Sequence, residues 1–231
     1  MSGGELIAAY IFGSVGRGNQ DHLSDLDVLA VVRNGQGRVS ESELLSKVPN
    51  RFSNLKSSVS WYGANRIEQM FRNGELFAWH LFRETVPLFD PHGFLEKIGK
   101  PAAYTDSVSD VISFRKVLQG IPNEVSENRG NAIYEAGLIY VCIRNIAMAA
   151  SWSLCNQPDF SRYSVFNLEG IPPCPLSLAE FEKTMFCRMA GQRGGVPPEG
   201  VDPNFVLGLH KRLAPWLEAL QIKLEEVKRR G

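Results

Sequence analysis

The chain has 231 residues, which is enough for one large domain or two small domains with hydrophobic cores. Its 25 basic and 25 acidic residues cancel, so the net charge does not call for a nucleic acid partner and is lower than a polymerase that grips long polyanions would carry. No segment has the length and unbroken apolar character of a membrane span, no secretion signal is evident, and the four cysteines lack metal-binding spacing, so we expect a cytoplasmic protein with reduced thiols and no membrane partner.

Two apolar runs near the N-terminus flank a glycine-rich elbow. The first run, Leu6–Phe12, predicts a strand that ends at Gly13 and Ser14, and the second run begins where Asp25 and Asp27 alternate with apolar residues. Side chains two positions apart on a strand point to the same face, so the two aspartates should lie side by side. Oxygen ligands at that spacing suit Mg²⁺, and the sequence therefore predicts a magnesium site.

The elbow itself has the composition of a phosphate cradle. Gly13 allows a close backbone approach, and Ser14 with its N–H can donate to a phosphate oxygen at the start of a short helix. Arg17 follows on the same turn, and its forked guanidinium suits an anion. The alternative interpretation is a pair of strands whose aspartates are merely solvated.

The remainder of the first hundred residues predicts a mixture of strands and helices. Ser40 and Glu43 form a capping-box pattern for a short helix through Lys47. Alternation over Leu55–Gly63 predicts a third strand, with Val59 and Trp61 on one face. Two helices and a short last strand follow, at residues 65–73, 75–84 and 86–89. We therefore expect an α+β fold that begins with a small mixed-sheet domain over residues 1–100.

After Pro101 the pattern changes to helical periodicity, which predicts an all-helical bundle over residues 101–231. The long apolar segment at residues 125–154 is typical of the buried centre of such a bundle. Ser177 and Glu180 form a second capping box. The other expected segments are helices at 107–118, 162–168, 177–189 and 204–230, the last with a candidate kink at Pro215, and a Gly/Pro-rich loop at 191–203. The helical half is also a candidate surface for a homodimer.

The elbow and its flanking strands resemble the catalytic signature of the DNA polymerase β-like nucleotidyltransferases, most closely the minimal bacterial members and their aminoglycoside-modifying relatives. The matching positions of the GSxxRG and SDxD elements are Gly13, Ser14, Arg17, Gly18, Ser24, Asp25 and Asp27. The resemblance implies that Asp25 and Asp27 are catalytic and hold Mg²⁺, and that the other five positions bind the nucleotide. It also implies transfer of a nucleoside monophosphate, AMP from ATP in the first instance, to a hydroxyl group.

The third strand departs from the family pattern. Relatives commonly carry a third carboxylate there, as a further metal ligand or as the general base. Here the expected face reads Ser58, Ser60 and Tyr62, with Ser60 as the favoured equivalent and Ser58 as the alternative. Serine cannot take a proton near neutral pH. Four nearby acids could substitute, although a solvated surface role is the simpler interpretation of each: Glu68, Glu75, Glu84 and Asp90.

Within the central helical segment, Arg144 and Asn145 begin a sequence that resembles the RNxxxH element of HEPN domains, which often accompany minimal nucleotidyltransferases. Ala149 stands where the histidine would be, so the general acid for RNA cleavage is missing and the resemblance is to a degenerate HEPN domain. An ion pair, a packing role and a place over the substrate are the open interpretations of Arg144. The four histidines form no constellation, and only His22 lies inside the elbow.

The acceptor is left open by the sequence. A small alcohol such as an aminoglycoside, a protein and an RNA are all compatible with the signature. The alternative to an enzyme is a nucleotide-binding regulator or toxin–antitoxin-like scaffold that lost catalysis together with the third carboxylate.

Overall fold

The chain forms two compact units in the computed structural model, which describes residues 5–230. One unit ends at Thr105 and the other begins at Asp106, five residues beyond the boundary drawn from composition. The first unit holds all the described strands and the second is helical, so the predicted α+β class is confirmed.

The first unit is built on a four-stranded mixed sheet in the order β3-β2-β1-β4. The strands are β1 (Leu6–Phe12), β2 (Leu26–Val32), β3 (Ser57–Gly63) and β4 (Val86–Phe89). β1 pairs antiparallel with β2 and with β4, whereas β2 and β3 run parallel. Each strand lies where the apolar pattern predicted one, and β3 begins two residues later than expected.

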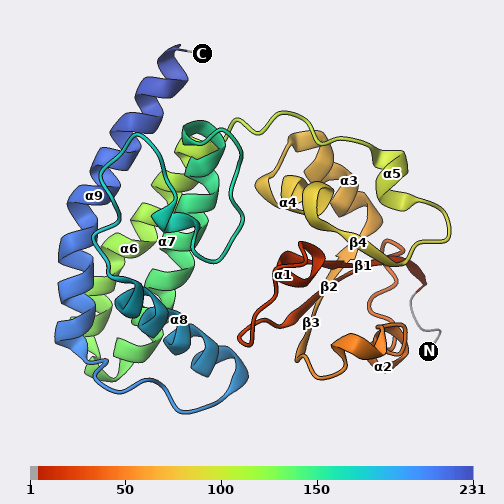
Figure 1. Cartoon of the computed structure of the whole chain (residues 1–231), viewed down its shortest axis with the longest axis horizontal. Helices are drawn as coiled ribbons and strands as arrows, with labels where there is room; N and C mark the ends of the chain where they lie inside the picture. The colour runs from red at the N-terminus through yellow and green to blue at the C-terminus, as the bar shows by residue number, and fades with distance from the viewer. Residues whose placement is uncertain (1–4, 231) are drawn as a thin grey trace. The chain divides into compact units, whose positions relative to one another are not determined.

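Helices cover both faces of this sheet (Figure 1). The face formed by Tyr10, Phe12 and Leu29 packs against helices α3 (Ala64–Asn73) and α4 (Leu76–Glu84). The opposite face packs against the short helix α2 (Glu41–Leu45), whose first turn is capped by Ser40, as predicted. Val59 and Trp61 belong to the α2 face and Tyr62 to the other, so the predicted alternation along β3 is confirmed.

Helix α5 (Phe94–Ile98) was not predicted, because five residues are too few to show helical periodicity. It begins where the carboxylate of Asp90 accepts the backbone N–H of Phe94 at 2.8 Å. The same carboxylate accepts the Tyr10 hydroxyl at 2.5 Å. Burial, with this hydrogen bond, raises the pKa of Tyr10. Asp90 therefore ties α5 to β1, and its predicted role as a solvated turn charge is wrong.

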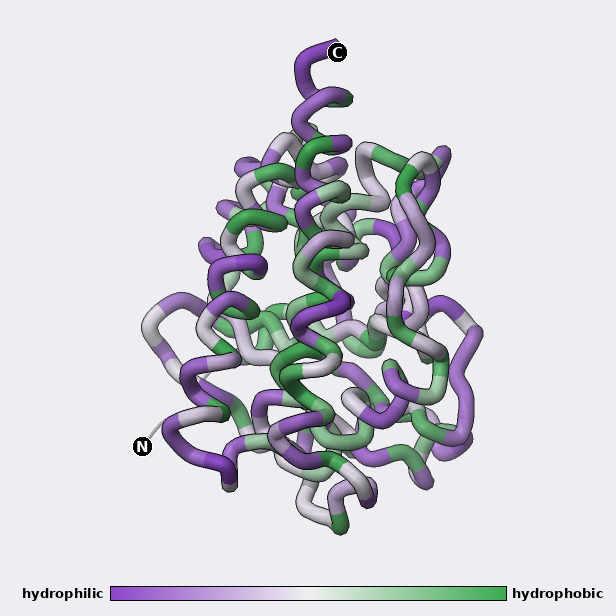
Figure 2. Tube along the Cα trace, turned by 90° about the vertical axis from the view of Figure 1, so that its left-hand side faces the viewer, coloured by the Kyte–Doolittle hydropathy of each residue, from purple (hydrophilic) through white to green (hydrophobic). Residues whose placement is uncertain are grey.

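Four long helices make up the second unit: α6 (Ser107–Glu127), α7 (Ala132–Leu154), α8 (Leu178–Arg193) and α9 (Pro203–Arg230). α7 is central and packs against the other three, and the capping box predicted at Ser177 and Glu180 is present at the start of α8. α9 continues through Pro215, and its tube alternates between polar and apolar segments in Figure 2 because one side of the helix is buried. Only a three-residue 3₁₀ turn, Ser164–Phe166, lies where the helix at 162–168 was expected.

The division between α6 and α7 differs from the predicted one. α6 continues through Pro122 to Glu127, and the break falls in the 3₁₀ turn Arg129–Asn131. A proline removes the N–H that would bond the carbonyl four residues earlier, here that of Leu118. His210 of α9 hydrogen-bonds Leu118 instead. A side chain from a helix far along the sequence thus replaces the missing bond, which the sequence pattern alone does not show.

α7, with the turn before it, is long and apolar enough to cross a membrane by length and composition, so the expectation that no segment meets this test was wrong. However, 61% of its most apolar stretch is buried within the protein, as is usual for a core helix. Its neighbours reach it closely at Gly137, where a Cβ would lie 3.0 Å from the backbone of Arg188 on α8. All four cysteines are free thiols, as predicted.

Candidate active site

The glycine-serine turn and the second aspartate meet at the end of β1. Gly13 begins the four-residue helix α1 (Gly13–Gly16) with φ +71°, a conformation that side chains disfavour. A Cβ at this position would lie 2.6 Å from Oδ2 of Asp27. The carboxylate therefore rests directly against the Gly13 backbone, and only glycine leaves room for it. Ser14 follows, partly exposed, on the same turn.

The two aspartates are presented by the start of β2. Asp25 immediately precedes the strand, and Asp27 is its second residue, opposite Phe12 of β1. Both carboxylates are half-buried, whereas Leu26 and Val28 between and beyond them are fully buried against α2. The alternation predicted from the sequence is thus present, and it directs Asp27 to the Phe12 face of the sheet.

The remaining predicted nucleotide contacts have structural partners of their own. The Ser24 hydroxyl donates to the carboxylate of Asp21 at 2.8 Å and accepts the Asp21 N–H at 3.0 Å. Ser24 is also buried, so its observed role is to close the turn that leads into Asp25. Gly18 is exposed with φ +73° and has open space around it, while His22 is exposed in the same loop.

Arg17 lies in a small buried charge network. Its guanidinium pairs with Glu84 at the end of α4 at 2.5 Å, and His80 lies 2.6 Å from the same carboxylate oxygen. The Glu84 side chain is only 6% exposed. A Cβ on Gly16 would collide with the backbone carbonyl oxygen of Glu84, so α1 and the end of α4 are packed tightly together. Glu84 is therefore not the solvated charge predicted from the sequence. It fixes the position of the arginine beside the turn.

The register of β3 decides which serine neighbours the aspartates. Ser58 lies directly beside Asp27, whereas Ser60 lies beside Leu29, one pair further into the sheet. The sequence favoured Ser60 as the equivalent of the third carboxylate, whereas the pairing places its alternative, Ser58, next to Asp27. Of the other acids considered, Glu75 forms an exposed ion pair with Arg66 at 2.7 Å.

The donor set at the turn fits a hard divalent cation. Two carboxylates are what Mg²⁺ commonly takes from a protein when substrate phosphates and water complete its shell. Among residues 5–230, no group of three or more His, Cys, Asp or Glu side chains is placed to hold a metal. A metal held by the protein side chains alone is therefore not indicated for this part of the chain.

In the helical unit, Arg144 donates to the backbone carbonyl of Phe160 at 3.3 Å, and Asn145 bonds the carbonyl of Val141 on its own helix at 2.7 Å. The Arg144 contact agrees with the packing interpretation. Residue 149, where an HEPN nuclease would carry its histidine, is an alanine and is fully buried, so this position offers no imidazole.

Comparison with known families adds one finding. The family model for the nucleotidyltransferase domain matches residues 3–69, a range that contains the glycine-serine turn, both aspartates and β3. This match supports the nucleotidyltransferase superfamily, and nucleotidyl transfer as the generic activity of the class. The HEPN resemblance lies outside the matched range and is not confirmed. A search of curated proteins found no match to the chain.

Proposed function

We propose that the chain transfers AMP from ATP to a hydroxyl group of a separate acceptor, with Asp25 and Asp27 as the residues that hold Mg²⁺. The observation that supports this most directly is the contact between Asp27 and Gly13. It brings the Asp27 carboxylate to the turn at which the triphosphate is expected, and Gly13 and Asp27 are far enough apart in sequence that only folding joins them.

In this proposal the chain's own groups bind and orient the donor. The Gly13 backbone lets the triphosphate approach closely, and Ser14 donates to its oxygens. Mg²⁺, when bound, supplies the charge neutralisation that phosphoryl and nucleotidyl transfer require. Arg17 is held beside the turn by Glu84, so its guanidinium is already positioned before substrate arrives, although the carboxylate offsets part of its charge.

The absence of an acid at Ser58 favours a second candidate. Neither Ser58 nor Ser60 can accept the proton of an attacking hydroxyl near neutral pH. A nucleotide-binding regulator or scaffold needs the donor site to bind the nucleotide, but it does not need a general base. An acceptor that brings its own base, or a substrate of lower pKa, would keep the enzyme active.

The two candidates separate in one experiment. Calorimetric titration of ATP with Mg²⁺ is run beside a transfer assay with α-labelled ATP against aminoglycosides, candidate proteins and RNA. Labelled acceptor supports the enzyme, and Mg²⁺-dependent binding with no transfer supports the scaffold. Asp25→Asn and Asp27→Asn should each weaken Mg·ATP binding at least about tenfold, since each removes a charged metal ligand. Glu127→Gln, an exposed site on α6, is the control. Unchanged binding in both asparagine variants contradicts the donor-site assignment.

Cytoplasmic location, a bacterial source and a homodimer formed through the helical unit stay predictions.

A further inference from the structure

A second groove lies in the first unit, away from the glycine-serine turn. It has a volume of about 700 Å³, within the range of small-molecule sites. Ile7, at the beginning of β1, forms part of its wall. Six residues of extended strand separate Ile7 from Gly13, a distance of roughly 20 Å at about 3.3 Å per residue. The groove is therefore distinct from the candidate active site.

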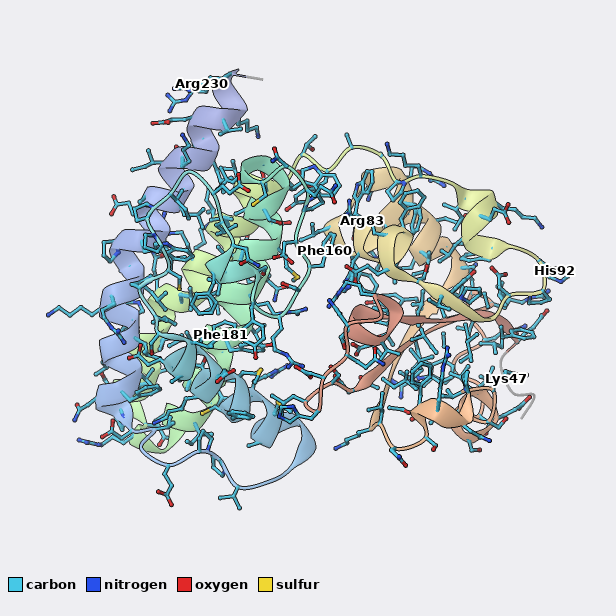
Figure 3. The ribbon with its side chains drawn as sticks, viewed as in Figure 1. Lys47, Arg83, His92, Phe160, Phe181 and Arg230 are labelled. Atoms are coloured by element: carbon cyan, nitrogen blue, oxygen red, sulfur yellow. The ribbon has the colours of Figure 1, made fainter. Side chains whose placement is uncertain are left out.

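The groove combines an apolar floor with a cationic rim. The floor is formed by Phe71 of α3 and by Phe94 and Ile98 of α5. The rim has four basic side chains and one acid: Arg72, His92, Lys97, Lys100 and Glu68. His92 lies at the outer edge of the unit, in the turn before α5 (Figure 3). Apart from the histidine, three cations face one carboxylate.

The cations at the rim are available to a ligand. In the part of the chain that the structure describes, neither Arg72 nor Lys97 has an acidic partner at ion-pair distance, although Glu68 lies one helical turn before Arg72. Both side chains are exposed. Lys100 lies over the ring of Trp79, 5.4 Å from its centre, which leaves its remaining donors toward the groove. The basic side chains of the groove thus outnumber its acidic side chains, and the excess positive charge is not neutralised within the groove.

We propose that this groove binds a small organic phosphate, with the phosphate at the Arg72–Lys97 rim and an aromatic or apolar body on the Phe94–Ile98 floor. A phosphate monoester carries a charge of about −1.5 to −2 at neutral pH, which matches the excess of cations over Glu68. The Arg72 guanidinium can bind two of its oxygens at once, and the ammonium groups serve as additional point charges. A ligand that carried one carboxylate in place of the phosphate would leave part of the positive charge of the rim uncompensated.

The groove also touches the segment that leads to the second unit. Ala102 forms part of its wall, donates its N–H to the Phe71 carbonyl at 2.8 Å and accepts the Trp79 indole N–H at 2.9 Å. These bonds hold the wall in place in the absence of a ligand. This part of the wall is thus preformed, and the ordering that a ligand requires falls mainly on the exposed side chains of Arg72 and Lys97.

AMP serves as the probe, in EDTA, so that binding does not depend on the proposed Mg²⁺ site. Calorimetry on the full chain should show AMP binding at least about tenfold more tightly than adenosine, which lacks the phosphate, and than inorganic phosphate, which lacks the body. Arg72→Ala/Lys97→Ala should weaken AMP binding at least about tenfold, since both charged contacts are lost. The matched control is Arg38→Ala/Lys116→Ala, which removes the same charge from two exposed sites elsewhere.

Three outcomes overturn the inference. The first is no binding at millimolar AMP, and the second is equal binding of inorganic phosphate, which would leave the apolar floor without a part. The third is loss of AMP binding in Ser14→Ala with no loss in Arg72→Ala/Lys97→Ala, which would place AMP at the glycine-serine turn. The proposed transfer activity is tested by other measurements, namely Mg·ATP binding and the labelling of an acceptor. Its failure would therefore not affect the AMP experiment.

Discussion

Replacing Gly13 by alanine tests the contact on which the candidate active site depends. The new methyl group would lie 2.6 Å from Oδ2 of Asp27, and ordinary contact begins at 3.4 Å, so the carboxylate has to move by about 0.8 Å or the turn has to open. Gly35→Ala is a matched control. Gly35, in the turn after β2 and outside the signature, has a similar φ, +77° against +71°, but nothing lies within 4 Å of its added Cβ.

The two variants share one cost and differ in another. An alanine in the left-handed conformation costs about 1–2 kcal/mol of folding free energy at either position. Only Gly13→Ala also displaces a metal ligand, and functional groups need to be held within about 0.5 Å of their working geometry. Mg·ATP binding should therefore fall at least about tenfold in Gly13→Ala and change less than about twofold in Gly35→Ala.

Calorimetric titration with Mg·ATP and denaturant unfolding are measured on both variants. Similar losses of stability with a selective loss of binding in Gly13→Ala support the geometry. If Gly13→Ala binds Mg·ATP as tightly as Gly35→Ala, binding does not require the Asp27 carboxylate to lie against the turn, and the reasoning from this contact is wrong.

Three further changes have outcomes set by the structure. Glu84→Gln removes the buried partner of Arg17 and should destabilise the first unit by about 3–5 kcal/mol in denaturant unfolding. Burial lowers the pKa of His210 below its ordinary 6.5, so the unfolded chain binds the proton more tightly and stability falls as the pH drops below that value. His210→Gln, which keeps a donor for Leu118, should reduce this slope in urea titrations between about pH 7 and 5. The hydrogen bond from Arg212 lowers the pKa of Glu180 to about 2, so its contribution is present above about pH 4.5 and lost as the pH falls toward 2. Glu180→Gln should remove that acid-side slope and, because the pair is partly exposed, cost less at neutral pH than Glu84→Gln.

Each of these has a result that contradicts it. Glu75→Gln breaks an exposed pair and should cost less than about 1 kcal/mol, so an equal loss in Glu84→Gln would show that burial adds nothing there. An unchanged pH slope in His210→Gln would mean that other groups titrate in that range. For Glu180, an acid-side slope that persists in the glutamine variant would rule out the carboxylate as its source.

Local sequence determined most of the first unit and the chemical character of its candidate site. Continuous apolar runs specify β1 and β2, because both faces of these strands are buried, and alternation specifies β3. The spacing of Asp25 and Asp27 predicts both on one face, because successive side chains of an extended chain alternate. α5 escaped prediction because its start depends on Asp90, whose own position is set by the hydroxyl of Tyr10, a residue 80 positions away.

Only the tertiary structure decided which groups meet. The contact of Asp27 with Gly13, the register that puts Ser58 beside Asp27, and the burial of Glu84 between Arg17 and His80 all join segments that are distant in the chain. Sequence periodicity reports which face of an element is apolar, but it holds no information on which polar group lies opposite across a fold. For the same reason the replacement of a missing helix bond by His210 became visible only when α6 and α9 were packed together.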